Sequence, residues 1–372
     1  MPRSYLDHNA TSPLRPEARD AMIKAFGCAG NPSSVHKEGR EVRSIVESAR
    51  ETVASVFGVE PDSVFFTSGG TEAANWLLQG WGKRMLLLSP TEHDCVLAGH
   101  RFEPDCVRFI PISSAGIADV SALKAVLEPG SLIAVQAANN ETGVLQPLEE
   151  IGKLAKEGHS TFICDAVQAI GRVPISSLTH ADVFFFSAHK FGGPKGVGAV
   201  VLRGKGFAPK PLLRGGGQER RQRSGTENVP GIAGLGAALK AAATEQKDFR
   251  ERATRLRGVI ESGLRSMAPD AVIFGQESER LPNTTCFAVP GMKAETLLIA
   301  LDLEGVSVSS GSACSSGKVE RSHVLDGMGV PKELSAGAIR VSTGWSTTEE
   351  EVERFLSAFS KICGRQHRRR AA

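Results

Sequence analysis

The sequence predicts an α/β protein with a largely parallel, helix-covered sheet and a smaller mixed part after it. Strand-length apolar runs alternate with segments of helical composition through the first half of the chain. The 372 residues are 41% hydrophobic and 23% charged, which suffices for one large core and a smaller second one. Beyond about residue 264 the elements become shorter and mixed, which indicates a second domain.

The expected elements of the first part follow in order along the chain. A helix is predicted over 41–56, where apolar residues recur at helical spacing. Buried strands are predicted at 64–67, 84–89, 132–137, 162–164, 183–186 and 197–202, and helices at 71–80 and 148–157. In such sheets ligands bind beyond the carboxyl ends of the strands.

A long helical region over 232–264 is expected to join the two parts. After it, strands are predicted at 284–289 and 306–309 and a helix at 295–303. Thr347 and Thr348 each precede a glutamate by three residues, which is the capping-box spacing and predicts the start of the last helix. The Arg-rich end, 365–370, is expected to be a solvated tail, with a specific binding arm as the alternative.

Charge and cysteine content restrict the class of protein. Lys and Arg number 44 against 41 Asp and Glu, a net charge of +3 that demands neither a nucleic acid nor a membrane as partner. Because residues 1–16 lack an apolar signal-peptide core and no stretch approaches about 18 apolar residues, we expect a cytoplasmic protein. The seven cysteines, at 28, 95, 106, 164, 286, 314 and 363, include no Cys-x-x-Cys pair, so neither a disulfide framework nor a zinc ribbon is indicated.

The sharpest local signal is Lys190, which follows an apolar strand and precedes the Gly-rich stretch 192–196. A lysine that forms a Schiff base must become a neutral amine near pH 7, so it needs burial or a nearby cation. A surface lysine in a loop is the alternative. Asp165 supports the first interpretation, because a buried carboxylate can keep the ring nitrogen of a pyridine cofactor protonated. Asp165 could equally cap a helix.

Three further polar segments follow predicted strands. Gly69, Gly70 and Thr71 combine glycines with a helix start, which suits an anion, although they match neither a P-loop nor a dinucleotide fingerprint. His93 could stack on a flat cofactor and move protons, or be structural. Asn140 lies in a segment that could be a simple turn. With Asp165, these polar ends should converge on one edge of the sheet, which indicates a site.

Two residues of the second part also suggest chemistry. Cys314 lies in a run of Ser, Gly and Ala, where a free thiol is either an activated nucleophile or an accidental surface cysteine. Arg340 lies in an apolar, strand-like stretch, where its charge needs a partner. A substrate carboxylate or a structural salt bridge would serve.

Together these motifs resemble the NifS/IscS-type cysteine desulfurases, in the class V aminotransferase group of fold type I pyridoxal-phosphate enzymes. The resemblance starts at Tyr5 and runs through every motif above to Arg340. It implies a mainly parallel seven-stranded sheet in a large domain over 13–248. The small domain would comprise 1–12 and 249–372 and carry the loop of the catalytic cysteine.

The resemblance also implies roles for individual residues. Lys190 would hold pyridoxal 5'-phosphate as a Schiff base, with Asp165 at its ring nitrogen, Gln168 at its phenolic oxygen and His93 stacked on the ring. Its phosphate would be held by the remaining cofactor residues: Gly70, Thr71, Ser187, His189 and, from a second subunit, Thr226. Asn140, which also contacts the cofactor, and Arg340 would bind the carboxylate of L-cysteine.

In that resemblance Cys314 takes the sulfur as a persulfide, alanine is released, and Lys190 and His93 move the protons. A homodimer is implied, with an iron–sulfur scaffold or another sulfur acceptor as partner. No intrinsic metal is expected, although Cys314 could transiently bind a cluster. Ser12 departs from the family pattern, which has threonine there. An aminotransferase, a selenocysteine lyase and a sulfur-relay scaffold are the alternatives.

Overall fold

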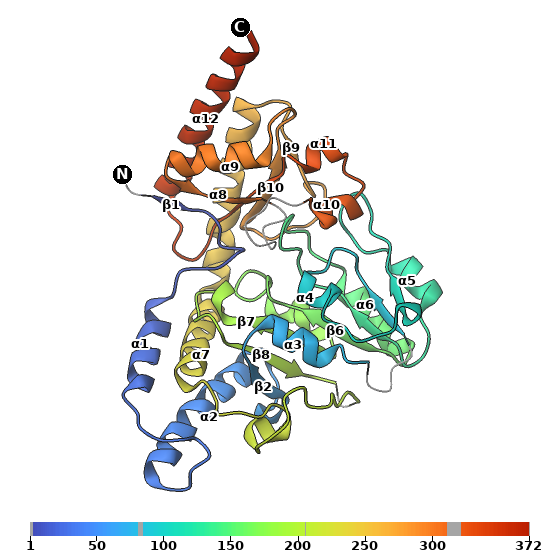
Figure 1. The fold of residues 1–372 in the computed structure, drawn as a ribbon, viewed down its shortest axis with the longest axis vertical. Helices are drawn as coiled ribbons and strands as arrows, with labels where there is room; N and C mark the ends of the chain where they lie inside the picture. Colours follow the sequence, from blue (N-terminus) through green and yellow to red (C-terminus); the bar gives the residue numbers. More distant parts are fainter. Residues whose placement is uncertain (1–2, 81–84, 205, 311–320, 372) are drawn as a thin grey trace.

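The computed structural model describes residues 3–80, 85–204, 206–310 and 321–371. They form a large lobe around one sheet and a smaller lobe that contains both the N-terminal strand and the C-terminal helix (Figure 1). Within these ranges every helix is too short or too polar to span a lipid bilayer.

The sheet of the large lobe has seven strands within the described ranges, in the order β2-β8-β7-β6-β5-β3-β4. Its strands are β2 (Val64–Thr67), β3 (Leu86–Leu88), β4 (Val107–Phe109), β5 (Leu132–Ala134), β6 (Thr161–Asp165), β7 (Val183–Ser187) and β8 (Gly198–Leu202). Strand β8 runs antiparallel to β2 and β7, whereas the other neighbouring strands are parallel. The predicted mainly parallel sheet is confirmed, and its strands β2, β3, β5, β6 and β7 end at one edge.

Helices cover both faces of this sheet because its strands are apolar on both sides. Phe184 and Phe186 of β7 pack into the core on one face, and Val183 and Phe185 into the core on the other. The first face is covered by α1 (Pro16–Phe26), α2 (Lys37–Phe57), α5 (Val120–Val126), α6 (Leu148–Glu157) and α7 (Val229–Thr244). The second is covered by α3 (Gly70–Leu77) and α4 (Asp94–Leu97). Short 3-10 turns lie at Pro61–Ser63, Pro104–Cys106, Ile175–His180, Ala188–Lys190 and Gln218–Arg221.

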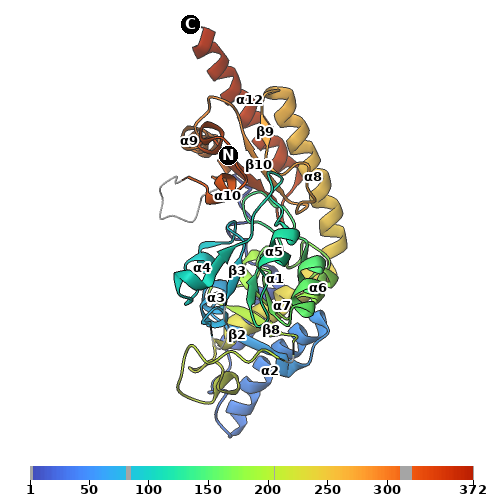
Figure 2. The same ribbon diagram turned by 90° about the vertical axis from the view of Figure 1, so that its right-hand side faces the viewer.

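The small lobe has its own core. Its antiparallel sheet has the order β12-β13-β10-β9, and β1 pairs with β11 beside it. The strands are β1 (Ser4–Tyr5), β9 (Val272–Ile273), β10 (Thr284–Ala288), β11 (Val306–Ser307), β12 (Ser309–Ser310) and β13 (Ile339–Ser342). The helices are α8 (Gln246–Met267), α9 (Ala294–Leu303), α10 (His323–Gly327), α11 (Lys332–Ser335) and α12 (Glu349–Ala371). Figure 2 shows α8 running beside both lobes. The domain boundaries given above stay a prediction.

Several predicted elements need correction. The region 232–264 is two helices, with Glu245 as the residue between the end of α7 and the start of α8. The backbone angles of Glu245 are close to helical, so the apolar pattern of the sequence continues across this break. The strands predicted at 84–89 and 132–137 are shorter, because β3 covers Leu86–Leu88 and β5 covers Leu132–Ala134, and residue 84 lies outside the described residues. The predicted strand 306–309 is split between β11 and β12.

The C-terminal end also differs from the prediction, because residues 365–370 continue helix α12 instead of forming a tail. Lys361 and Arg365 both pair with Glu304 of the small lobe, which ties this helix down beyond its apolar stripe. The predicted start of the last helix, α12, is confirmed. The Thr348 N–H donates to Glu351 Oε2 at 3.0 Å and the Glu351 N–H donates to Thr348 Oγ1 at 3.3 Å.

Candidate active site

A cavity of about 570 Å³ lies at the edge where the parallel strands end. The structure brings together there most of the residues predicted from the sequence: Gly70, Thr71, His93, Asn140, Asp165, Gln168, Ser187, His189, Lys190 and Arg340. Residues 9–11, which enter from the N-terminal segment, also line it. The expected convergence of polar strand ends is therefore present.

Lys190 lies in the hairpin between β7 and β8, at the end of the turn Ala188–Lys190. Its Nζ donates to the carbonyl oxygens of Asn9 and Ala10 at 2.7 and 2.9 Å. The amino group is therefore held over the cavity by the N-terminal segment, whose contribution the sequence analysis missed. The sequence signal was that the family resemblance already starts in this segment, at Tyr5.

Asp165 ends β6 and is 8% exposed. Its Oδ1 accepts a hydrogen bond from the Val167 N–H at 2.8 Å, so it stabilises a turn and not the helix considered in the sequence analysis. Burial raises the pKa of the Asp165 carboxyl to about 6, although the bond from Val167 and the charge of Lys190 oppose that rise. A cationic ring nitrogen beside this carboxylate would favour its charged form.

The start of α3 forms a cradle for an anion. Gly69 has φ 149°, a conformation that L side chains rarely adopt, and a Cβ there would lie 3.4 Å from Ser187 Oγ. The Gly70 N–H donates to Ser187 Oγ at 2.7 Å. Helix N-termini bind phosphate through such N–H groups and the helix dipole. The same cavity edge carries Thr71 and Lys195.

The two histidines of the site are neutral near pH 7. Burial, with the charges of Lys190, Lys195 and Arg172, lowers the pKa of His189 to about 4, and its Nδ1 lies 3.1 Å from Thr11 Oγ1. Burial and the charge of Lys190 also lower the pKa of His93.

His93 has a structural role as well as a place in the cavity. Its Nδ1 accepts from the Cys95 N–H at 3.1 Å and so caps α4. A neutral ring that accepts at Nδ1 holds its proton on Nε2. Both interpretations of His93 made from the sequence therefore remain compatible.

Arg340 on β13 makes the salt bridge that the sequence analysis gave as an alternative. Its Nη2 donates to Asp7 Oδ1 at 2.7 Å, and its Nη1 donates to the carbonyl of Asn140 at 3.0 Å. Its Nε is buried without a hydrogen-bond partner in the described part of the protein. Because Arg340 and Asn140 both line the cavity, a carboxylate role remains open to them.

One predicted residue does not line this cavity, and another lies outside the described residues. Thr226 is exposed and does not line the cavity of its own chain. Cys314 lies outside the described residues. The chain enters segment 311–320 from β12, where Ser309 pairs with Arg340, and leaves it near Ser322, whose Oγ donates to Glu141 Oε2 at 2.5 Å.

Sequence reasoning missed two buried charged residues behind the site, Glu92 and Arg172. Glu92 is 1% exposed, and its Oε1 accepts from the Gln136 N–H at 2.8 Å. Burial and the neighbouring Asp165 raise the pKa of Glu92 well above its usual range, which favours the protonated form of this carboxyl. Its position directly before His93 was the available signal. Arg172 follows Gln168 by four residues in a run of small and apolar residues.

The residues present fit pyridoxal phosphate. The cavity holds an amine, a buried carboxyl and a helix N-terminus preceded by a glycine at φ 149°, and these are the partners that the aldehyde, ring nitrogen and phosphate of this cofactor require. Their roles stay predictions.

Comparison with known proteins agrees with this arrangement. Residues 4–355 match the family described as Aminotransferase class-V. Cysteine desulfurase IscS of Dictyoglomus turgidum is 42% identical, over 96% of this chain and 94% of that protein. A solved NifS-like protein has a TM-score of 0.90 at 37% identity, covering 97% of this chain and 99% of that one. The structure of SspA in complex with cysteine has a TM-score of 0.78 at 26% identity, covering 93% and 100%. The chain belongs to the class-V aminotransferase family.

Proposed function

We propose that the chain is a pyridoxal-phosphate-dependent cysteine desulfurase that converts L-cysteine to L-alanine and holds the sulfur as a persulfide on Cys314. The observation that carries the proposal is the convergence of Lys190, Asp165 and the N-terminus of α3 on one cavity. The relatives named cysteine desulfurase, which match nearly the whole chain, support the substrate and the reaction.

The reaction balances without an external oxidant or reductant. L-Cysteine and the Cys314 thiol give L-alanine and a Cys314 persulfide. The bond between Cβ and sulfur of the substrate breaks and a sulfur–sulfur bond forms. The proton taken from Cα is replaced there, Cβ gains one proton from a thiol, and the proton of the other thiol stays with the persulfide. Sulfur then leaves Cys314 for an acceptor that supplies the reducing thiol.

Pyridoxal phosphate, when bound, supplies an electron sink that makes the Cα proton of the substrate acidic. Lys190 would hold its aldehyde carbon and Asp165 its ring nitrogen. Gly70, Thr71, Ser187 and His189 would bind the phosphate, and Gln168 the phenolic oxygen. The helix N-terminus and the nearby Lys195 supply positive potential for that phosphate.

Proton transfer falls to Lys190 and His93. The Nζ of Lys190 accepts a proton only when it is a neutral amine, and its hydrogen bonds to two carbonyl oxygens fix its position at the cavity. His93 Nδ1 is occupied by the Cys95 N–H, so Nε2 is the atom that would give or take a proton. Its lowered pKa keeps the ring neutral, as a base needs.

Arg340 and Asn140 would bind the substrate carboxylate. The guanidinium already lies against an anion, Asp7, and retains a buried Nε with no hydrogen-bond partner in the described ranges. A substrate carboxylate could add to this arrangement as a second anion.

Cys314 is proposed as the sulfur acceptor because the strand that precedes its segment pairs with a strand that carries a cavity residue. Ser309, five residues before it, pairs with Arg340. Four peptide units separate Cys314 from Ser310, so their Cα atoms can be at most about 14 Å apart. The reaction needs its thiolate form, which requires a nearby base or cation to lower the thiol pKa.

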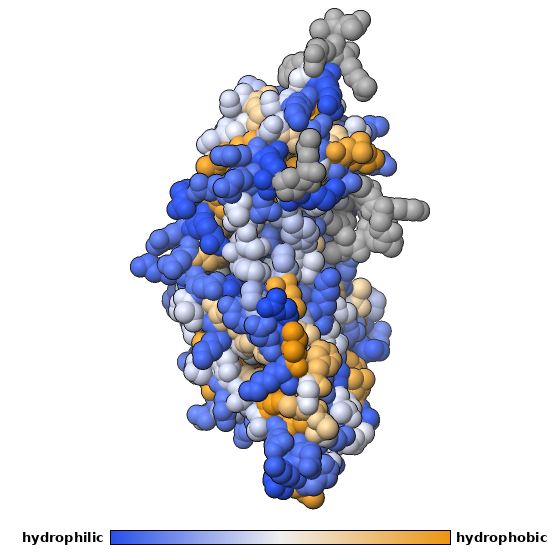
Figure 3. All heavy atoms as spheres, turned by 90° about the vertical axis from the view of Figure 1, so that its left-hand side faces the viewer, coloured by the Kyte–Doolittle hydropathy of each residue, from blue (hydrophilic) through white to orange (hydrophobic). Residues whose placement is uncertain are grey.

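A homodimer would complete the site through Thr226 of the second subunit. Thr226 is exposed and does not line the cavity of its own chain, which suits a residue that serves a neighbour. Apolar side chains also gather on the lower part of the face that carries α1 (Figure 3). Ile23 and Phe26 of α1 and the nearby Val35 are 62%, 72% and 84% exposed. Exposed apolar side chains of this size suit a subunit interface.

We further propose that the enzyme works in the cytoplasm and passes sulfur to iron–sulfur cluster assembly or to another acceptor. Cys28, Cys106, Cys164 and Cys286 carry free thiols, which suits a reducing compartment. The relatives named IscS support the cluster pathway.

The test measures alanine and sulfide formed from L-cysteine by the protein reconstituted with pyridoxal phosphate in the presence of a thiol reductant. Cys314→Ala should retain the cofactor absorbance and lose both products. Cys28→Ala, a change at an exposed cysteine, is the control and should keep full activity. Equal turnover by wild type and Cys314→Ala would refute the proposal, and pyruvate or keto-acid formation would instead favour an aminotransferase.

A further inference from the structure

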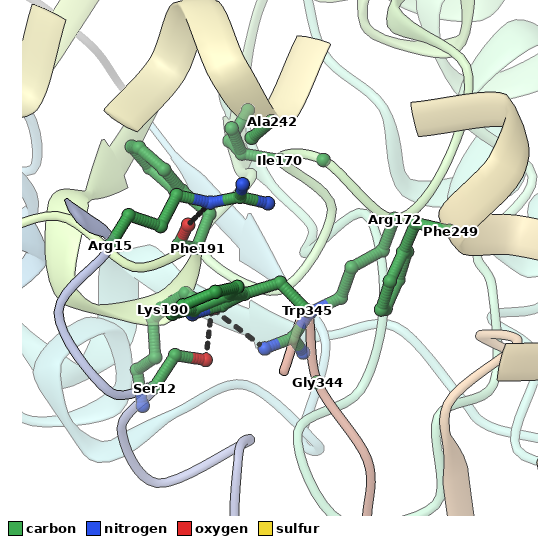
Figure 4. Close-up of a pocket in the computed structure, with 11 residues that line it drawn as sticks. Ser12, Arg15, Ile170, Arg172, Lys190, Phe191, Ala242, Phe249, Gly344 and Trp345 are labelled. Carbon is green, nitrogen blue, oxygen red and sulfur yellow. Dashed lines mark hydrogen bonds between the residues drawn. The ribbon is translucent and has the colours of Figure 1, made fainter. Parts of the chain in front are cut away.

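Arg172 is buried behind the proposed cofactor site, on the side of Lys190 that faces away from the cavity. It is 4% exposed. Figure 4 shows its side chain pointing toward Lys190 across a small pocket of about 20 Å³, which Trp345 and Ser12 also line. The Lys190 carbonyl accepts from Arg172 Nη2 at 3.1 Å and from Ser12 Oγ at 3.0 Å. Arg172 therefore contacts the main chain of the lysine itself.

All the hydrogen-bond acceptors around this guanidinium are neutral. Nη1 donates to Gln168 Oε1 and, at 2.8 Å, to Asn9 Oδ1. Nη2 donates to the carbonyl of His8 at 3.2 Å, besides that of Lys190. In the described part of the chain no carboxylate forms an ion pair with Arg172. Buried arginines elsewhere in the protein do have such a partner, as Arg50 has Glu219.

A buried cation without a counterion is costly, so its retention needs a reason. Burial and the charge of Arg340 lower the pKa of Arg172 to about 9, which still leaves the guanidinium cationic at pH 7 to 8. The positive charge therefore persists next to the site, with no anion of the described chain to neutralise it. An anionic group bound in the cavity would supply the missing compensation.

The contact between Arg172 and Gln168 determines the orientation of the Gln168 side-chain amide. A guanidinium has only donors, so it must face the amide oxygen and not the amide nitrogen. Gln168 Nε2 is thereby turned away, and it donates one N–H to the carbonyl of Asn9 at 3.0 Å. The amide has a second N–H, and because Gln168 lines the cavity, this N–H is available to a group bound there. With the opposite orientation of the amide, two donors would face each other at Arg172.

We propose that Arg172 is a positioning residue that locks the Gln168 amide with its N–H toward the cavity and, by polarising that amide, strengthens its hydrogen bond to the anionic oxygen of the bound cofactor. This inference rests on the proposed function, in which Gln168 contacts the phenolic oxygen of pyridoxal phosphate. Hydrogen bonds in a chain polarise one another, and a charged first donor makes the effect larger. The same guanidinium fixes the side chain of Asn9, whose main-chain carbonyl accepts from Lys190.

The experiment titrates apoprotein with pyridoxal phosphate and measures the dissociation constant and the absorbance of the bound cofactor. Four variants are compared with wild type: Arg172→Met, Arg172→Lys, Gln168→Ala and the double variant Arg172→Met/Gln168→Ala. Arg280→Met is the control, because Arg280 is a buried arginine paired with Glu261 in the small lobe.

Arg172→Met should raise the dissociation constant about tenfold, which is the loss of one charge-assisted interaction. It should also move the absorbance to shorter wavelength, because the phenolic oxygen is then more readily protonated. Arg172→Lys keeps a cation, so it should change the logarithm of the dissociation constant less than half as much as Arg172→Met does. Arg280→Met should lower stability and leave both cofactor readouts unchanged.

The double variant distinguishes positioning from a merely structural role. If Arg172 acts through Gln168, adding Arg172→Met to Gln168→Ala should change the dissociation constant less than about twofold. Additive effects of the two substitutions, or an unchanged spectrum in Arg172→Met, would overturn the inference. Should Arg172→Met fail to fold, the same cycle is run with Arg172→Lys. A wild-type protein that does not bind the cofactor would instead refute the proposed function.

Discussion

Asp165→Asn should stabilise the apoprotein near neutral pH while weakening its hold on the cofactor. The Asp165 carboxyl is 8% exposed, and burial raises its pKa from an ordinary 3.8 to about 6. The folded chain therefore binds this proton more tightly than the unfolded chain. As pH rises from about 4 to about 6, the folded state must increasingly bury the charged form, and stability falls.

The size of the effect follows from the two pKa values. A shift from 3.8 to about 6 corresponds to about 3 kcal/mol once both states are ionised, at pH 7 and above. At pH 4 the same group costs only about 0.5 kcal/mol. Asn carries no charge and can still accept from the Val167 N–H, so the variant should avoid the pH-dependent cost of burying the charged carboxylate. Its advantage over wild type should grow by about 2 kcal/mol between pH 4 and pH 8.

The assay is urea unfolding of both apoproteins at several pH values, with Asp119→Asn as the control. Asp119 is an exposed helix cap that accepts from the N–H groups of Ser121 and Ala122, and Asn caps a helix about as well. Adding pyridoxal phosphate should reverse the order of stability, because the ring nitrogen then needs the carboxylate. An advantage that is equal at pH 4 and pH 8, or a less stable variant at pH 8, would refute the reasoning.

Three other substitutions test separate parts of the site. Gly69→Ala, at φ 149°, should raise the dissociation constant of pyridoxal phosphate about tenfold. The control is Gly130→Ala, at φ 83° with open space around it, which should cost about 1 kcal/mol of stability and leave that dissociation constant unchanged. Arg340→Lys should raise KM for L-cysteine about 10- to 100-fold with a much smaller change in kcat, and steady-state kinetics with the reverse pattern would contradict a role in carboxylate binding. Glu92→Gln should alter the free energy of unfolding by less than about 1 kcal/mol at pH 7.5, because burial favours the protonated form of this carboxyl; a loss above about 2 kcal/mol would show that it is charged.

Elements with a strong apolar pattern were predictable from the sequence. The strand β2 and the helix α6 have the predicted bounds, because apolar side chains fill one or both faces and polar residues mark their ends. The position of the site at one edge of the large sheet was also predictable, because polar residues follow parallel strands that end at the same edge. Helix α1 was missed because it begins at a proline without a side-chain cap and its apolar stripe is weak.

Buried polar residues were the part that sequence reasoning could not find. Arg172 and Glu92 lie in segments of ordinary composition, and their importance comes from what the fold packs around them. Asn9 shows the same limit. It joins Lys190 to Gln168 and Arg172 only after the N-terminal segment has reached the carboxyl ends of β6 and β7. Such long-range contacts leave no periodic pattern in the sequence.

The most direct test of the central claim is peptide mapping by mass spectrometry after wild-type holoenzyme reacts with L-cysteine in the absence of reductant, followed by alkylation. The account predicts one additional sulfur atom on the peptide that contains Cys314, in an amount matching the alanine formed, and none in Lys190→Ala. Alanine formation with no sulfur on Cys314, or with the sulfur on another cysteine, would contradict it.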